Sequence, residues 1–599
     1  MNLTFGQRMR AAFAWERSIC RLIASWCAFA ATVLLFNSGF AELAYAQDVA
    51  FWQIVLGTGL FFVLFSAVAL LLADLPSDSW FLLLAASLCV FRWLLEFEGD
   101  DTSFLFVLVV IVVYALFVVY CLRANEALLR EWHPGKRTVM GLALLIGIAS
   151  CAVIAVITCL RYKTFSSPNF DFGLFCNMFY NMKETGLPMI TSERDYLLSH
   201  FAVHISPIYY LLLPFYALFP SPMTLQIGQA VALALGVIPV VLLARHHKLS
   251  GRTTLLIAAL YAFYPALSCG TFYDIHENCF LPLFLLLTFL FYEKKKYIPM
   301  YLSALCVLAV KEDAAIYLLL FALFVLLSER NWLHGTVLTV LSVGYFGFCA
   351  YMLEKHGLGM MVNRFNNLIY DSGDGLLGAI KTALVNPGYL LTQLFTTSKG
   401  TWEKLVYACQ MLLPLGLLPF CSKKPSRWLL VSPILINLLT YYQYQYDIGF
   451  QYHFGITAFL VYAMIKNLPA LSAPTRRNLL GVAAAACCCI YLFTVVPKLN
   501  TYVNRWENGK ETYAQMEAFL DTAIPADASV SSSTFLLAHI ADRDVIYEVK
   551  YHGDAPDIDY VVLDMRYKSY LDTMQAYLDQ GYAVSSQLEE LIVVLKKQP

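Results

Sequence analysis

Uninterrupted apolar runs recur along most of this chain, and they limit its possible folds more than any other feature. Residues 103–122 (SFLFVLVVIVVYALFVVYCL) show the pattern, with no charged side chain among them. Roughly 20 helical residues cross a bilayer core about 30 Å thick. Only 14% of the 599 residues are charged, against about 25% in an average soluble domain. We therefore predict a polytopic α-helical membrane protein of the cell membrane.

The apolar runs predict about fifteen spans. They are expected at 19–41, 51–73, 80–97, 103–122, 139–160, 225–244, 253–268, 280–292, 298–311, 314–328, 332–353, 405–420, 428–443, 453–466 and 478–496. Basic residues gather between spans, at 123–137, 245–252, 294–296, 423–427 and 466–477. Basic loops stay in the cytoplasm, so we place these loops and the N-terminus there. The net charge of −1 gives no argument for binding nucleic acid.

Residues 201–219 (FAVHISPIYYLLLPFYALF) decide whether this topology is consistent. If they crossed the bilayer, every later basic loop would lie outside. Pro207 and Pro214 interrupt the run, and we predict a re-entrant or juxtamembrane segment. Irregular backbone at that depth is tolerated where it is buried in protein or lines a cavity. The outer face then collects the loops at 161–224, 269–279, 354–404 and 441–453 and the corner at 311–313, where acidic and histidine residues concentrate.

The last hundred residues have the composition of a soluble domain and lack any apolar span. Strand-like and helix-like runs alternate there, which is typical of a small α/β fold. Strands are expected at 529–532, 545–549, 560–563 and 591–595, and helices at 511–522, 534–541 and 569–580. We predict three parts: N-terminal membrane spans at 1–138, a membrane core at 139–498 with the outer loop 161–224, and an extracytoplasmic α/β domain at 499–599.

Asp171 is the first candidate for chemistry, since it directly follows a span at the membrane surface. It is read as a general base, as a group that orients a substrate hydroxyl, or as the N-cap of the next helix. His200 and His204 are four residues apart and would share a helix face. That spacing suits a metal ion, a phosphate or carboxylate partner, or plain interfacial histidines. Without the glutamate of a zinc protease the metal motif is weak, and the metal remains unassigned.

Several further polar groups lie at span ends, where they are costly unless they face a cavity. Asp274, His276 and Glu277 are read as acid/base groups or metal ligands, or as a solvated loop. Lys311, Glu312 and Asp313 interrupt an apolar run, either at a lipid-phosphate site or in a turn with local salt bridges. His453 opens a late span beside interfacial tyrosines. As substrate-binding candidates we name His200, His204, Asp274, His276, Glu277, Lys311, Glu312, Asp313 and His453.

Several of these motifs occur in an order that resembles a membrane family known as domain of unknown function 2079. They are FDFGLF (170–175), SHFAVHISPIYYLLLPFYALFPSP (199–222), FYDIHEN (272–278), AVKEDAAIYL (309–318), QYHFGITAFL (451–460), SSSTFLLAHIADRDVIYEV (531–549) and DYVVLD (559–564). The resemblance covers about residues 165–565. That family is distantly similar to GT-C glycosyltransferases, polytopic enzymes that use polyprenyl-phosphate sugars.

The resemblance implies a catalytic acid in the first large outer loop, and Asp171 stands at that place. His200 with Pro207 loosely matches a histidine–proline motif of one GT-C branch. The chain has a single acid in FDFG, unlike the paired acids common in GT-C loops, so Mg²⁺ or Mn²⁺ is compatible with the motifs and not required by them. The predicted partners are a polyprenyl-phosphate-linked sugar and membrane lipids.

The function expected from these features is sugar transfer from a polyprenyl-phosphate donor on the outer face of the membrane. Two alternatives stay open: a transporter or flippase of lipid-linked precursors, and a non-catalytic membrane protein. Transporters place polar residues near the bilayer midplane in repeated halves. Here the charges stand at span ends, which favours the enzyme.

Overall fold

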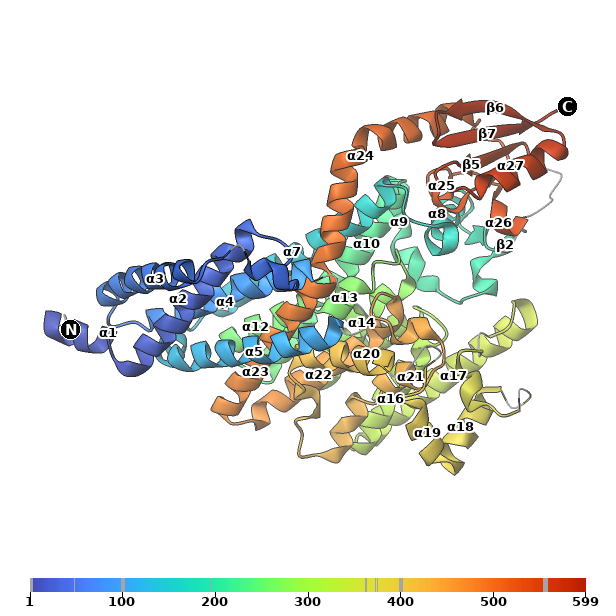
Figure 1. The fold of residues 1–599 in the computed structure, drawn as a ribbon. Coiled ribbons are helices and arrows are strands. Elements are labelled where there is room, and N and C mark those ends of the chain that lie inside the picture. The colour runs from blue at the N-terminus through green and yellow to red at the C-terminus, as the bar shows by residue number, and fades with distance from the viewer. Residues whose placement is uncertain are drawn as a thin grey trace.

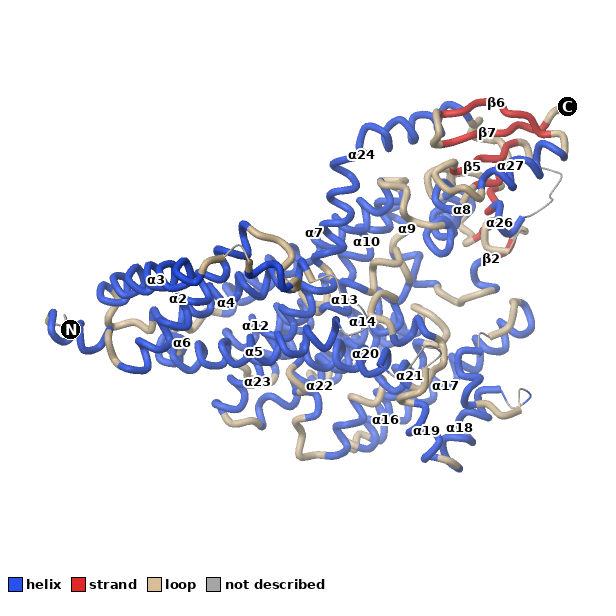
Figure 2. The backbone as a smooth tube through the Cα atoms, in the orientation of Figure 1, coloured by secondary structure: helices blue, strands red, loops and turns tan. Residues whose placement is uncertain are grey.

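The computed structural model is a long helical bundle with a small β-sheet at one end (Figure 1). It describes all residues from 4 to 599 except 48, 98–102, 195, 361–362, 372, 374, 398–401 and 553–557. Figure 2 shows that the strands gather in one region, close to the C-terminus. The polytopic helical class is confirmed.

The N-terminal helices form a group of their own. They are α1 (Phe5–Ala12), α2 (Trp15–Phe36), α3 (Phe51–Leu71), α4 (Ser77–Glu96), α5 (Ser103–Ala124) and α6 (Glu126–Glu131). Arg21 is fully buried and joins α2 to α4, with Nε 2.7 Å from Oδ1 of Asp78. Arg17 places its Nε 2.6 Å from the other carboxylate oxygen. Removing one partner of such a buried pair leaves an uncompensated charge, so the pair fixes how these two helices pack.

The middle of the chain forms the core of the bundle. Its helices are α7 (Lys136–Lys163), α8 (Leu174–Thr185), α9 (Leu213–Leu218), α10 (Pro222–Leu235), α11 (Val237–His246), α12 (Gly251–Ala262), α13 (Pro265–Cys269), α14 (Leu281–Glu293), α15 (Tyr297–Leu308), α16 (Ala314–Leu327), α17 (Trp332–His356), α18 (Gly375–Val385), α19 (Pro387–Gln393), α20 (Trp402–Leu412), α21 (Ile434–Leu438), α22 (Phe454–Asn467) and α23 (Ala473–Thr494). The strands β1 (Met189–Ile190) and β2 (Leu198–Ser199) pair as a short antiparallel ribbon after α8.

Within the described residues, eight helices are long and apolar enough to cross a membrane, against the fifteen spans expected. These are α2, α3, α4, α5, α7, α10 with α11, α17, and α23 with the helix that follows it. Several expected spans are shorter: α16 and α22 have 14 residues each, a rise of about 21 Å. The runs at 405–420 and 428–443 break into α20, short turns and α21, where Pro414, Pro419 and Pro433 stand. A proline ends a helix because it has no N–H and clashes with the preceding turn.

The segment 201–219 contains no helix long enough to span. It folds into tight turns and the six-residue α9, with Pro207 and Pro214 each at the start of a helical piece. The basic loops, in contrast, meet one another. Arg427 donates to the carbonyl of Lys466 at 3.2 Å, and Lys466 pairs with Glu293 at 2.6 Å. This is the arrangement that one shared membrane face requires, and its assignment to the cytoplasm stays a prediction.

The C-terminal part is a five-stranded mixed sheet. Its elements are β3 (Val530–Ser532), α25 (Thr534–Leu537), β4 (Ile546–Glu548), α26 (Val549–His552), β5 (Tyr560–Asp564), α27 (Tyr570–Asp579), β6 (Tyr582–Leu588) and β7 (Ile592–Lys597). The strand order is β4-β3-β5-β7-β6, with β3 parallel to both neighbours and β7 antiparallel to β5 and β6. The four expected strands are present, and β6 was not predicted.

A long helix connects this sheet to the bundle. α24 (Val496–Ala523) continues from α23, and the two cover 51 residues. It therefore runs through the boundary expected at 498. Figure 1 shows α24 rising from the bundle beside α7 and reaching the sheet, and α24 packs against α7.

Candidate functional site

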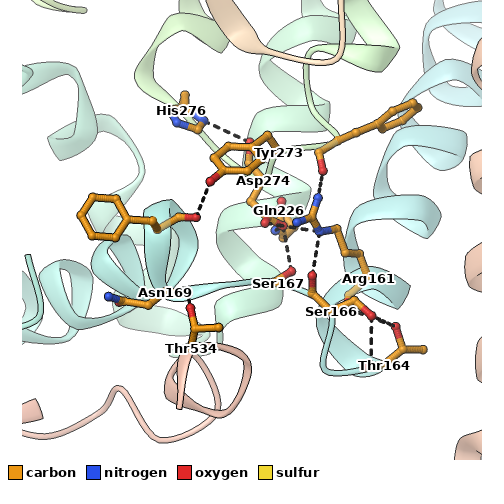
Figure 3. Close-up of polar contacts among 12 residues, drawn as sticks. Arg161, Thr164, Ser166, Ser167, Asn169, Gln226, Tyr273, Asp274, His276 and Thr534 are labelled. Atoms are coloured by element: carbon orange, nitrogen blue, oxygen red, sulfur yellow. Dashed lines mark hydrogen bonds and ion pairs between the residues drawn. The ribbon is translucent and has the colours of Figure 1, made fainter. Parts of the chain in front are cut away.

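The turn that carries Asp171 is held by the C-terminal domain. Asn169 is fully buried. Its backbone N–H donates to Oγ1 of Thr534 at 3.1 Å (Figure 3), and its Nδ2 donates to Oε2 of Glu548 at 2.8 Å. Figure 1 shows α8, which follows this turn, directly beneath the sheet. The turn is thus positioned by residues near the other end of the chain.

α8 itself makes further contacts with the same domain. The buried Asn177 donates from Nδ2 to the carbonyls of Ala541 and Arg543, at 3.0 and 2.9 Å. Thr191 accepts from the N–H of Ile546 at 3.0 Å and donates to its carbonyl at 2.7 Å. A buried polar group left without partners costs about 1–3 kcal/mol, so these contacts define one docked arrangement.

Asp274 ties three segments together. Its Oδ1 accepts from Oγ of Ser167 at 2.9 Å and from Nε2 of Gln226 at 2.6 Å, and Nε of Arg161 lies 3.5 Å from its Oδ2 (Figure 3). Asp274 is buried. Burial raises the pKa of Asp274, while the Arg161 charge and the two hydrogen bonds oppose that rise. Its carboxylate is already surrounded by protein groups, so Asp274 acts as an anchor between the end of α7, α10 and the loop before α14.

Asp171 pairs with His276, so two of the candidate residues named from the sequence are in direct contact. Oδ2 of Asp171 lies 2.7 Å from Nε2 of His276, and the side chain of Asp171 keeps 29% of its surface exposed while that of His276 keeps 5%. Burial alone would raise the pKa of Asp171, but the hydrogen bond and charge of His276 outweigh it and lower that pKa. Burial alone would lower the pKa of His276, and Asp171 raises it instead. The pair therefore favours a carboxylate beside an imidazolium.

The next residue joins this pair to a lysine. Oε1 of Glu277 lies 3.0 Å from Nζ of Lys311, and its Oε2 accepts from the hydroxyl of Tyr209 at 2.8 Å. Both ionised groups are buried. Burial would raise the pKa of Glu277, but Lys311 lowers it, and Glu277 in turn raises the pKa of Lys311 against the effect of burial. The adjacent residues His276 and Glu277 thus contact Asp171 and Lys311, respectively.

A pocket opens beside Lys311. Glu312 reaches its wall with Oε1 2.9 Å from Nδ1 of His204 and Oε2 3.1 Å from the N–H of Ile205. Asp313 also lines it, and burial raises the pKa of that carboxyl against the Lys311 charge. Burial lowers the pKa of His204, with Lys311 acting in the same direction.

Arg364 brings a second cation to this pocket and was not among the sequence candidates. Its guanidinium carbon lies 4.8 Å from the ring centre of Tyr452 and 5.2 Å from that of Tyr442. Among the described residues it has no ion-pair partner. Arg364 belongs to the predicted outer loop 354–404, which also holds Lys355, Lys381, Lys399 and Lys404, so no sequence feature singled it out.

Among the described residues, two histidine candidates make no hydrogen bond or ion pair with this network, although the ring centre of His200 lies 6.1 Å from those of His204 and Tyr209. His200 is buried, with Nδ1 3.6 Å from Oε2 of Glu193, and its ring packs near Phe175. His453 is fully buried, and its Nε2 lies 2.6 Å from the carbonyl of Ala266. The structure therefore brings together Asp171, His204, His276, Glu277, Lys311, Glu312 and Asp313, with Asp274 as their anchor. In the described part of the chain, no three His, Cys, Asp or Glu side chains are placed to hold a metal ion.

Comparison with known families confirms the family resemblance. The sequence pattern of a family described as predicted membrane protein (DUF2079) matches residues 161–593. No curated protein matches the chain. Among solved structures, the chain is similar to ArnT from Cupriavidus metallidurans bound to undecaprenyl phosphate, at 12% identity over 77% of this chain and 99% of ArnT, with a TM-score of 0.45. It is also similar to the Archaeoglobus fulgidus oligosaccharyltransferase in complex with Zn and sulfate, at 12% identity over 72% and 69% of the two chains, with a TM-score of 0.40.

Proposed function

For this chain, which belongs to the DUF2079 family of predicted membrane proteins, we propose sugar transfer from a polyprenyl-phosphate donor to a hydroxyl acceptor. One observation carries the proposal. Two adjacent residues make both key contacts: His276 bonds Asp171, and Glu277 forms a salt bridge with Lys311. The partly exposed Asp171 carboxylate and the pocket beside Lys311 are thus held by the same short segment. Grouped titratable residues whose pKa values are shifted by each other are typical of functional sites.

Asp171 acts on the acceptor. Its free oxygen holds the acceptor hydroxyl, whose oxygen attacks the anomeric carbon of the donor sugar. The bond from that carbon to the phosphate oxygen breaks, and the polyprenyl phosphate leaves with the electron pair. Asp171 takes the hydroxyl proton as the new glycosidic bond forms. Because its pKa is lowered, Asp171 is ionised and ready to accept this hydrogen bond near neutral pH, and a positioned general base contributes about 10²- to 10⁴-fold.

Lys311 and Arg364 act on the leaving phosphate. Negative charge grows on the phosphate as the bond breaks, and fixed cations stabilise it without reorganising. Arg364 supplies a planar donor group that suits phosphate oxygens. Asp313 and Glu312 line the same pocket and hold sugar hydroxyls. The proposal does not require a divalent cation, and EDTA added to the assay tests whether Mg²⁺ or Mn²⁺ takes part. We place the reaction on the outer face, following the basic-loop prediction.

Transfer by the purified full-length protein tests this function. Mannose, glucose, galactose and arabinose are each presented on a polyprenyl phosphate, and label appearing in a glycosylated product is measured. We expect Asp171→Asn to lose at least about 100-fold in rate. Asp579→Asn, an exposed aspartate on α27, should keep the wild-type rate. Full activity of Asp171→Asn would remove its assigned role. Movement of the donor across liposomes without transfer would identify a flippase and overturn the proposal.

A further inference from the structure

A second pocket lies in the C-terminal domain, at the carboxyl ends of its parallel strands. Its walls come from Ser533 to Phe535 after β3, from Glu548 to Lys550 at the end of β4, and from Leu563 and Asp564 at the end of β5. Residues 567–573, at the start of α27, close the far side. We call this pocket the switch-point cleft.

The strand order explains why a cleft forms here. After β3 the chain crosses through α25 to β4 on one side of the sheet, and after β5 it crosses through α27 to β6 and β7 on the other side. The connections that leave β3 and β5 therefore diverge between two neighbouring strands. In open α/β sheets, ligands bind at such a topological switch point, outside the carboxyl ends of the strands. Asp564 bridges the two strands, since its N–H donates to Oγ of Ser533 at 3.0 Å.

The lining of the switch-point cleft selects a type of ligand. Phe535 and Tyr567 stack with ring centres 5.3 Å apart, and Tyr567 is 48% exposed. The negative faces of aromatic rings attract the C–H groups of a sugar ring. Thr534, Ser569 and Thr573 add hydroxyls to the wall. Aromatic surface with a few placed polar groups is typical of small-molecule sites.

The charges of the cleft argue against an anion. Asp564 is buried and its charge is matched by Arg566, whose Nη2 lies 2.6 Å away. Glu548 is buried as well, and its Oε2 accepts from Asn169. Lys550 is exposed at the rim. A phosphate would therefore meet the buried Glu548 carboxylate, whereas a neutral polyhydroxyl ligand can donate to it.

We propose that the switch-point cleft binds a neutral saccharide, and that this saccharide is the acceptor of the transfer reaction. The second half rests on the proposed function, and the binding itself does not. The wall of the cleft is also the support of the catalytic turn. Glu548 and Thr534 both line the cleft and both bond Asn169, which lies two residues before Asp171. A sugar chain held in the cleft is thus presented next to the turn that carries the acid.

Saturation-transfer NMR on the full-length protein tests the binding. The probes are maltotriose, cellotriose and triacetylchitotriose at millimolar concentration, in a detergent without a sugar headgroup. We expect at least one trisaccharide to receive saturation, and Tyr567→Ala and Thr573→Val each to reduce that signal at least about 5-fold. Tyr196→Ala removes a tyrosine of similar exposure, 50%, outside the cleft and should leave the signal unchanged. No signal from any probe, or an unchanged signal in both cleft variants, would overturn the proposal.

The two proposals fail in different ways. Asp171→Asn should keep the full saturation signal while it loses transfer, because the acid does not line the cleft. If no donor supports transfer but Tyr567→Ala still abolishes saccharide binding, the cleft stands and the glycosyltransferase assignment falls. With an active donor, Tyr567→Ala should raise the acceptor KM about 10-fold and leave the donor KM unchanged. An equal rise in both constants would remove the acceptor role.

Discussion

The Nε2 atom of His276 lies 2.7 Å from Oδ2 of Asp171, and this contact controls the protonation of both groups. The ring stands in a segment anchored by Asp274, whose carboxylate is held from α10 and from the end of α7. The imidazole is therefore fixed from behind while the acid stays half-open in front. The imidazole of His276 makes the Asp171 carboxylate a weaker base that stays ionised over a wider pH range.

The pH dependence of transfer should report this contact. Burial alone would raise the pKa of Asp171, and His276 is the main group that lowers it. The active carboxylate form is present above that pKa and is lost as the pH falls through it. His276→Gln should therefore move the acid limb of the pH–rate profile to higher pH. His453→Gln changes a buried histidine outside the network and should leave the acid limb in place. An acid limb unchanged in both variants would contradict the pairing.

Removal of Lys311 should separate stability from activity. Lys311→Met leaves Glu277 buried without its cation, a loss of about 3–5 kcal/mol in the free energy of unfolding. The double variant Lys311→Met/Glu277→Gln removes both charges and should recover most of that loss. Its transfer rate should nevertheless stay low, because no ammonium faces the leaving phosphate. Thermal unfolding followed by tryptophan fluorescence measures the first effect, and the transfer assay measures the second.

The chain offers a matched control for this variant. Lys466 is equally buried and pairs with Glu293 at 2.6 Å and with Glu329 at 3.2 Å, among the basic loops. Lys466→Met should lower stability to a similar extent. The folded fraction of Lys466→Met should retain its transfer rate per molecule. If the Lys311 double variant regained both stability and full activity, Lys311 would be a structural residue only.

Arg364 should matter for the donor and not for the acceptor. Arg364→Gln removes the charge that lies over Tyr442 and Tyr452, and we expect polyprenyl phosphate to bind about 10-fold more weakly, or roughly 1.4 kcal/mol. Arg364→Lys keeps the charge, loses the planar donor group and should recover part of the affinity. Competition by polyprenyl phosphate in the transfer assay provides the measurement. Equal inhibition of all three proteins would exclude Arg364 from the phosphate site.

The contact between α8 and the C-terminal domain should be needed for an ordered site. Asn177→Ala removes two hydrogen bonds to Ala541 and Arg543 and a third that Oδ1 accepts from the N–H of Thr191, and each buried group left without a partner costs about 1–3 kcal/mol. We expect faster amide exchange in the turn around Asp171 and a lower transfer rate. Asn181→Ala removes bonds to Asn177 and Met189 within the loop itself, which makes it the matched control. Equal exchange in the two variants would mean that docking does not order the turn.

Much of the fold follows from local patterns in the sequence. The apolar runs at 51–73 and 103–122 correspond to α3 and α5, because an unbroken run of that length has one stable form in lipid. The expected strands β5 and β7 likewise contain apolar runs, whereas β3 (VSS) and β4 (IYE) are short and mix apolar with polar residues. β6 escaped prediction because Ser585, Ser586 and Gln587 interrupt its apolar residues and only Tyr582 is buried, so its pairing with β7 is what defines the strand.

For the candidate site, the sequence pointed to individual residues but not to the contacts between them. Asp171, His276 and Lys311 stood out because charge at a span end is costly. Their pairing depends on how α7, α10 and the loop before α14 pack, which no local pattern encodes. Asp274 appeared as a possible reacting group, but its partners Gln226 and Ser167 make it an anchor. Asn169 gave no signal at all, since its partner Glu548 is 379 residues away.

The separation of 379 residues between Asn169 and Glu548 means that the two partners are synthesised at different times. Ribosomes add about 5–20 residues per second, so roughly 20 to 75 s pass between the synthesis of Asn169 and that of Glu548. During this interval the side-chain amide of Asn169 can bond only within the first outer loop, to the carbonyl of Ser192, which lies 3.2 Å away in the finished fold. A chain that stops before β3 can still insert its spans, yet the turn that carries Asp171 lacks the contacts of Asn169 with Thr534 and Glu548. On the proposed function, the transfer site is therefore complete only after the last strands are made, and a chain that has not reached them stays inactive in the membrane.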